Sequence, residues 1–257
     1  MHESVAHLFT QYFYVIAGNT AEIRQIACNI RYQVYCQEFK YEPEENCPNQ
    51  MESDEYDEQS DHCLLIHTHT HKPAGCVRLI RSLPNKPNPP LPFARFCKQA
   101  FNKEQFDPDH LPLGTFVEIS RLAVTAQFRR RKYDEHKPIS LPLEQTTEPV
   151  DIPGVDRRRQ FPFIPIGLVL SAFTMILRNN YQYSLAMMET RLANMLSRYG
   201  LIWTQVGEVM DYHGPRAPFV LRRDKILPNL ESKPEVHELL RVIDEQLNQN
   251  IPLTFTA

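Results

Sequence analysis

Apolar residues recur every three or four positions in several stretches of the chain, which is the spacing of an amphipathic helix. The first stretch follows Asn19, which we expect to be the N-cap, with Glu22 completing a capping box. The last stretch follows Ser232, which we expect to form a second capping box with Glu235. The third stretch ends at Gly200, and glycine is common just after the end of a helix. The pattern predicts helices over residues 23–34, 164–177, 192–199 and 236–247.

Shorter apolar runs bounded by turn residues predict β-strands. Lys72-Pro73 separates two of these runs and predicts a hairpin. Strands that alternate with helices are typical of a three-layer α/β or α+β fold. The predicted strands cover residues 62–71, 74–83, 115–125, 183–188, 203–212 and 219–222.

Proline interrupts the pattern in two long stretches, at about residues 84–114 and 133–163. Both are polar or irregular, and neither shows the apolar periodicity of a separate core. A chain of 257 residues can form one large domain. We therefore expect residues 1–257 to form a single domain that carries these two stretches as excursions.

The overall charge is close to balanced, with 28 Lys and Arg against 31 Asp and Glu and a net charge of −3. This balance gives no reason to expect nucleic-acid binding. Prolines 162 and 165 interrupt the most apolar stretch, 161–177, so we expect no transmembrane segment. The first residues lack a basic flank followed by an uninterrupted apolar segment, and we expect a cytoplasmic protein.

Charged residues lie inside two of the apolar runs. Arg78 is in the run 76–80, and Glu118 and Arg121 are in the run 116–124. Because an unpaired buried charge is costly, these residues need charged partners. The acidic loop 42–61 offers an E-x-D-x-x-D spacing, and the sequence therefore predicts one buried cluster with Glu52, Asp54 and Asp57. Spacing alone leaves open whether the cluster is a set of structural ion pairs or a functional site.

A carboxylate beside an arginine in a strand can act as a general base, because the arginine fixes its ionisation and orientation. Glu118 could accept a proton from an amine, directly or through one water. Acyl transfer to nitrogen requires this step, because an ammonium has no lone pair. The sequence contains no G-x-S-x-G, Walker or Rossmann string, so a Ser or Cys nucleophile has no support.

Two further patterns each have two interpretations. His67, His69 and His71 alternate, so they could bind a metal or form a polar face; no cysteine or carboxylate follows at diagnostic spacing, and we expect no metal.

The basic run 129–132 follows the predicted strand 115–125 and is either a solvated turn or a docking patch for an acidic partner. It contains no glycine, which favours an acidic carrier protein over a coenzyme A pyrophosphate cradle.

Taken in order, these residues resemble a known motif set, that of the acyl-homoserine lactone synthases. The resemblance covers about residues 20–125 and continues more weakly through 164–200. The elements that carry it are Arg31-x3-Tyr35-x5-Tyr41, Glu52-x-Asp54-x2-Asp57, Arg78, and Glu118-x2-Arg121.

The resemblance implies a fold similar to the GCN5-related N-acetyltransferases (GNAT), a three-layer α/β fold with a central mixed sheet flanked by helices. Those synthases move a fatty acyl chain from acyl carrier protein to the amine of S-adenosylmethionine. Related families are the N-acyl amino acid synthases and the acyltransferases of PEP-CTERM/exosortase systems, and the chain looks most like the last. The resemblance implies an acyl-phosphopantetheine donor on acyl carrier protein, with acyl-coenzyme A as an alternative, and no permanently bound cofactor.

The resemblance also implies roles for individual residues. Tyr35 and Tyr41 stand where the family usually has Phe and Trp, so we expect an amino-acid-like amine as acceptor. The alternatives are lactone synthesis from S-adenosylmethionine and a non-catalytic protein that binds an acyl carrier or ligand. We expect direct transfer, an oxyanion bound by a strand N–H, and an acyl tunnel along helix 164–177. The expected catalytic residues are Glu118, Arg121, Arg78, Asp54 and Asp57; the substrate-binding residues are Arg31, Tyr35, Tyr41 and Glu52; and the carrier-docking residues are Arg129, Arg130, Arg131 and Lys132.

Overall fold

A computed structural model of the chain describes residues 3–84, 90–129 and 161–249. The described strands form one mixed sheet in the order β1-β2-β3-β4-β5-β8-β6, with β7 paired to β8. Only β4 and β5 pair in parallel. The strands are β1 (Phe13–Gly18), β2 (Ser60–His67), β3 (Pro73–Arg81), β4 (Phe116–Val124), β5 (Tyr183–Met188), β6 (Thr204–Gln205), β7 (Met210–Asp211) and β8 (Pro215–Arg222).

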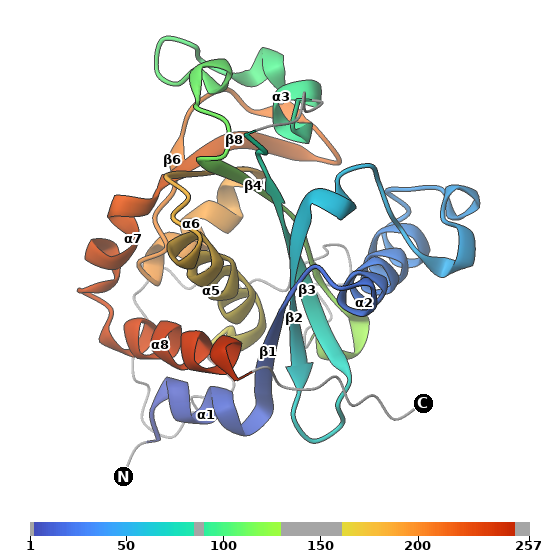
Figure 1. The fold of residues 1–257 in the computed structure, drawn as a ribbon, viewed down its shortest axis with the longest axis vertical. Coiled ribbons are helices and arrows are strands. Elements are labelled where there is room, and N and C mark those ends of the chain that lie inside the picture. The colour runs from blue at the N-terminus through green and yellow to red at the C-terminus, as the bar shows by residue number, and fades with distance from the viewer. Residues whose placement is uncertain (1–2, 85–89, 130–160, 250–257) are drawn as a thin grey trace.

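Helices cover both faces of this sheet, so the molecule has three layers (Figure 1). Residues of α1, α5, α6, α7 and α8 share one large hydrophobic core with the sheet, and α2 packs on the other face with a smaller core. The helices are α1 (Val5–Tyr12), α2 (Ala21–Arg31), α3 (Pro92–Phe96), α5 (Phe163–Arg178), α6 (Thr190–Arg198), α7 (Arg223–Leu230) and α8 (Pro234–Asn248). Among the described residues, none of the helices has the length and hydrophobicity that crossing a bilayer requires.

The alternation of side chains in β3 explains why an arginine is buried there. Val77 and Leu79 point into the large core under α5, whereas Cys76 packs against α2. Arg78 shares the face of Cys76 and is only 1% exposed. A charge in this position requires partners from α2 and from the loop that follows it.

Two predicted helix caps are wrong. Thr20 caps α2, because its hydroxyl accepts the N–H of Ile23 at 3.3 Å, while the Asn19 side chain donates to the Glu58 carbonyl at 2.6 Å. Helix α8 begins at a proline whose missing N–H needs no acceptor, and no side chain caps it. The predicted Ser232 capping box is therefore absent from this helix.

Most predicted strands are confirmed, but the run 203–212 contains only the short strands β6 and β7. The first Pro-rich excursion contains the short helix α3, which begins at Pro92. The second lies almost wholly outside the described residues. The N-terminal pair α1 and β1, for which the sequence pattern gave no prediction, adds an edge strand to the hairpin β2–β3.

Candidate active site

A cluster of three arginines and three carboxylates lies between α2 and the sheet; we call it the charged cluster. Arg31, at the end of α2, is fully buried at its centre. Its Nη1 and Nη2 donate to the two carboxylate oxygens of Asp57 at 2.6 and 2.9 Å, and its Nε donates to Glu52. Its Nη2 also donates to the Glu52 carbonyl at 2.7 Å, so this guanidinium locks the loop to the helix.

The two strand arginines complete the charged cluster. Arg78 Nη1 donates to Asp54 at 2.6 Å and to Asp57 at 2.9 Å, and its Nε donates to the Ser120 hydroxyl at 3.2 Å. Arg121 binds Glu52 Oε1 through Nη2 at 2.9 Å and Nε at 3.1 Å. Three positive and three negative groups are thus paired with one another, and the cluster is neutral as a whole.

The ionisation of the cluster follows from this pairing. Burial favours the neutral form of Glu52, but Arg121 and Arg31 outweigh it and lower the carboxyl pKa to about 2. Burial likewise opposes ionisation of Asp57, and Arg31 and Arg78 hold its pKa well below the usual value. Burial and Arg31 lower the pKa of the neighbouring His62 to about 4, so this imidazole is neutral at pH 7. The cluster therefore keeps fixed charges across the neutral pH range.

A β-bulge in β4 brings Arg121 to the cluster. Val77 of β3 lies opposite two residues of β4, Arg121 and Leu122, and Arg121 has a left-handed backbone with φ of 55°. The extra residue shifts the alternation of side chains, so Ala123 also joins the core under α2. Without the bulge, residues 118 and 121 would point to opposite faces of the sheet.

Strands β4 and β5 separate just beyond Glu118. Their parallel pairing runs from Phe116 and Tyr183 to Glu118 and Leu185, although both strands continue further. Two adjacent pockets lie where the strands part. They share six lining residues: Tyr35, Ile119, Ser120, Arg121, Met187 and Arg216.

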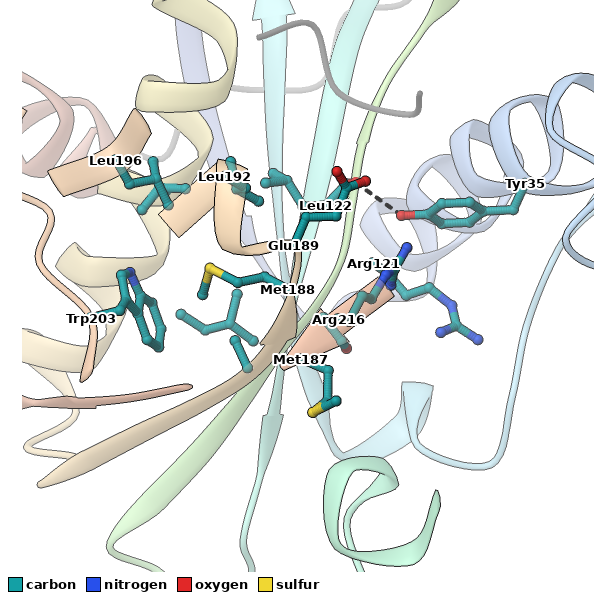
Figure 2. A pocket seen from close by; sticks show the side chains of 14 residues that line it. Tyr35, Arg121, Leu122, Met187, Met188, Glu189, Leu192, Leu196, Trp203 and Arg216 are labelled. Atoms are coloured by element: carbon teal, nitrogen blue, oxygen red, sulfur yellow. Dashed lines mark hydrogen bonds between the residues drawn. The ribbon is translucent and has the colours of Figure 1, made fainter. Parts of the chain in front are cut away.

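The first is an apolar pocket of about 100 Å³ between β4, β5 and α6. Figure 2 shows Leu192, Leu196 and Trp203 at one end of it and Tyr35 and Arg121 at the other. Helix α5, which we expected to line the acyl tunnel, contributes only Val169 among the residues that line this pocket. Most of α5 is packed into the core instead, and the acyl tunnel along 164–177 stays a prediction.

The second is a smaller, polar pocket of about 60 Å³ with several aromatic walls. Tyr35 stacks on Tyr41 with ring centres 6.1 Å apart, and Tyr41 in turn packs on His213 at 5.2 Å. The Tyr35 hydroxyl donates to the Leu122 carbonyl at 2.9 Å, which ties this wall to the bulge. Tyr35 lies in the π-helical segment Tyr32–Glu38 that follows α2.

Glu118 lines the polar pocket and differs from every carboxylate of the charged cluster. Its side chain is 4% exposed, and its Oε2 accepts the backbone N–H of Phe93 at 3.0 Å. Among the described residues, no cation lies within ion-pair distance of it. Burial, only partly offset by the Phe93 N–H, raises the pKa of Glu118 to about 7.

This arrangement corrects one prediction. We expected Arg121 and Arg78 to fix the ionisation of Glu118, but both arginines bind the acidic loop instead. Arg31, Arg78, Glu52, Asp54 and Asp57 form the wall behind the pockets and line neither of them. Of the predicted site residues, the pockets bring together Glu118, Arg121, Tyr35 and Tyr41.

The basic run after β4 lies mostly outside the described residues, which include Arg129 but not Arg130, Arg131 or Lys132. The Arg129 side chain is only 4% exposed, forms an ion pair with Glu38 and lies over the Phe39 ring at 4.8 Å. Arg129 is therefore not presented for carrier docking. His67, His69 and His71 lie at the turn of the hairpin. The described residues contain no group of three His, Cys, Asp or Glu side chains that could hold a metal ion.

Sequence reasoning missed several residues of the polar pocket, among them Tyr212, His213 and Arg216. Arg216 lies near the start of β8, on the sheet face opposite to the buried Ala217. Arg78 was singled out because it lies inside an apolar run, whereas Arg216 lies just before the apolar run 217–221 and so gave no such signal. Nor did the pattern indicate that β8 lies beside β5.

Comparison with known proteins gives two results. Residues 30–136 match the family model described as an acetyltransferase (GNAT) domain. Among solved structures, TofI, in a ternary complex with an inhibitor and MTA, is 16% identical, with 87% of this chain and 99% of TofI covered and a TM-score of 0.55. The acyl-homoserine lactone synthase LasI is 13% identical, with 87% and 96% covered and a TM-score of 0.56.

The chain has the GNAT fold. A third structure agrees: BjaI, a coenzyme A-dependent acyl-homoserine lactone synthase with SAM and isopentyl-CoA, is 14% identical, with 86% and 90% covered and a TM-score of 0.55. No curated protein sequence matches the chain. The predicted fold class, a GNAT-like mixed sheet flanked by helices, is confirmed. In this GNAT fold, the two pockets lie where β4 and β5 part.

Proposed function

We propose that the chain is an N-acyltransferase that moves a fatty acyl chain from a thioester to the amine of an amino-acid-like acceptor. One observation carries the proposal: Glu118, with a pKa of about 7, lines a polar pocket that adjoins an apolar one. The apolar pocket suits an acyl chain, and the polar pocket suits a small amine. Their shared wall is the place where the two substrates meet.

The reaction needs a base, because the acceptor amine is an ammonium at neutral pH. Glu118 takes this proton, directly or through one water, and its pKa near the working pH suits it to the role. The Phe93 N–H holds one carboxylate oxygen in place and leaves the other to face the pocket. The amine then attacks the thioester carbonyl, and the thiolate leaves with no covalent enzyme intermediate.

The developing oxyanion lies at the open edge of β4. Beyond Glu118 this edge has no pairing with β5, so its backbone N–H groups are available to a substrate oxygen. Arg78, Asp54 and Asp57 act indirectly in this proposal. They hold the bulge and the loop in position, and Arg121 joins them while lining both pockets.

The donor is an acyl thioester on the phosphopantetheine of acyl carrier protein, with acyl-coenzyme A as the alternative. BjaI, which shares the fold, is described with isopentyl-CoA and SAM. Lactone synthesis from S-adenosylmethionine is the second candidate: the stacked Tyr35 and Tyr41 keep two aromatic rings at the family's aromatic positions, although the family usually has Phe and Trp there. A link to PEP-CTERM/exosortase systems rests on the sequence resemblance alone and stays a prediction.

Mass spectrometry of lipid extracts from a bacterial host that expresses the chain tests the proposal, with Glu118→Gln as the matched control. We expect a new series of N-acyl amino acids that the control host lacks. An acyl-homoserine lactone would instead establish the second candidate. If no new lipid appears, and purified protein with amino acids leaves both carrier-bound and coenzyme A thioesters intact, the proposal is wrong and the chain is a binding protein.

A further inference from the structure

Arg216 differs from the other arginines around the site in having no carboxylate partner. Arg31, Arg78 and Arg121 are each paired with two carboxylates of the charged cluster. Arg216 lines both pockets, yet no Asp or Glu of the described residues lies within ion-pair distance of it. A partly buried guanidinium without a counter-ion is a ready site for an anionic group of a ligand.

Arg216 lies on the same face of the sheet as Glu118, the carboxylate that would activate the amine. Strand alternation places Arg216 on the face of β8 that also carries Val220, and Val220 shares a hydrophobic cluster with Phe116 of β4. Glu118 is two residues from Phe116 and therefore lies on that same face of the sheet. The amine-activating carboxylate and the unpaired guanidinium thus line one pocket of about 60 Å³, which is the scale of a small molecule.

The other charged groups of the polar pocket do not replace Arg216. Arg121 is bound by Glu52 and Asp54. Glu42 would repel an anion, and its carboxylate lies 3.9 Å from His213 Nε2. Burial and Arg216 lower the pKa of His213, which is therefore mostly neutral at pH 7.

We propose that Arg216 binds the carboxylate of the acceptor and so selects α-amino acids over simple amines and amino-acid amides. In an α-amino acid one carbon separates the amine from the carboxylate, so a single small pocket can hold both groups. The guanidinium donates paired, charge-assisted hydrogen bonds to the carboxylate oxygens, while Glu118 faces the amine. This inference rests on the proposed function and defines its acceptor class.

The test is calorimetric binding of two product analogues that differ only in charge, N-decanoylglycine and N-decanoylglycinamide. We expect the wild type to bind the acid about 10- to 100-fold more tightly than the amide. Arg216→Gln should bind both with equal affinity, and its unchanged affinity for the amide would show that the pocket is intact. Arg222→Gln, at the exposed end of the same strand and paired with Asp224, should keep the wild-type preference.

Equal binding of the two analogues by the wild type would overturn the inference and leave the proposed function standing. If Arg216→Gln still binds the acid more tightly than the amide, another group binds the carboxylate, and the inference is also overturned. Failure of the wild type to bind either analogue would contradict the proposed function together with the inference.

Discussion

The charged cluster and the polar pocket use the same residue types in opposite ways. In the cluster, Arg31, Arg78 and Arg121 are each bound by carboxylates, and the group is neutral. In the pocket, which lies directly against the cluster, Glu118 has no cation partner and Arg216 has no carboxylate partner among the described residues. The two regions share Arg121 as their common wall.

The difference appears in the pKa values of two buried glutamates. Burial opposes ionisation of both, but paired arginines lower the pKa of Glu52 to about 2, whereas a lone backbone N–H leaves that of Glu118 at about 7. A paired carboxylate keeps its charge and holds structure. An unpaired one can gain and lose a proton near neutral pH, which is what acid–base catalysis requires.

The largest effect should come from removing the unpaired carboxylate. We expect Glu118→Gln to lower kcat by about 10²–10⁴-fold, because the amine then lacks its base. The variant should fold, since Gln keeps the shape of the side chain and can still accept the Phe93 N–H. Steady-state kinetics measures kcat, and circular dichroism shows whether the variant is folded. Glu55→Gln, which changes an exposed carboxylate, is the control.

The same substitution has a pH-dependent effect on stability. Because folding raises the pKa of Glu118 from 4.5 to about 7, its contribution to stability is fully present below pH 4.5 and is lost as the pH rises through about 7. Glu118→Gln removes this loss, so its stability relative to the wild type should increase between pH 5 and pH 8. A variant that is inactive because it is unfolded would show no cooperative unfolding transition at any of these pH values.

Breaking a paired charge should affect folding before it affects chemistry. Arg31→Met leaves Glu52 and Asp57 buried with fewer partners, and we expect a loss of about 3–5 kcal/mol in the free energy of unfolding. Chemical denaturation measures this, with Arg24→Met on the same helix as the control. If Arg31→Met were as stable as the control but inactive, the cluster would be catalytic rather than structural.

Much of this contrast could be predicted from the sequence, because charges in apolar runs need partners. The pairing of Arg78 and Arg121 with the acidic loop follows from their positions inside apolar runs. Arg31 was expected only to bind substrate, and its place at the centre of the cluster was not predicted. The sequence could not show that Glu118 is excluded from the cluster. Nor could it show the bulge at Arg121, where one residue with positive φ brings this side chain to the face of Arg78 and Glu118.

The two pockets could not be predicted from local sequence patterns either. Arg216 reaches the site because β8 lies beside β5, and α6, β6 and β7 separate these two strands in the sequence. Trp203 reaches it from the segment that follows α6. The run 203–212 was apolar enough to predict a strand, yet it contains only the two-residue strands β6 and β7, and its end residues Trp203 and Tyr212 line the pockets. The missed strand β1 is apolar and adjoins a helix, so no polar alternation marked it.

The smallest predicted effect concerns chain-length preference in the apolar pocket. Ala186 lines this pocket from β5 and is almost fully buried. Ala186→Leu should lower kcat/KM for long acyl donors by about tenfold, because the added carbons fill space equivalent to about three methylenes. The rate with a butyryl donor should stay within about threefold of the wild type. An equal loss with both donors would show that the acyl chain binds elsewhere.

The central claim is that Glu118 is the unpaired base, and the pH dependence of kcat/KM tests it most directly. The acceptor ammonium alone gives log(kcat/KM) a slope of one against pH in the neutral range. In the wild type Glu118 removes this proton itself, so log(kcat/KM) should rise with a slope of one only up to about pH 7, where Glu118 ionises, and then level off, while Glu118→Gln keeps a slope of one throughout. A wild-type slope that stays at one up to pH 8.5, or the same break in both proteins, would contradict the account.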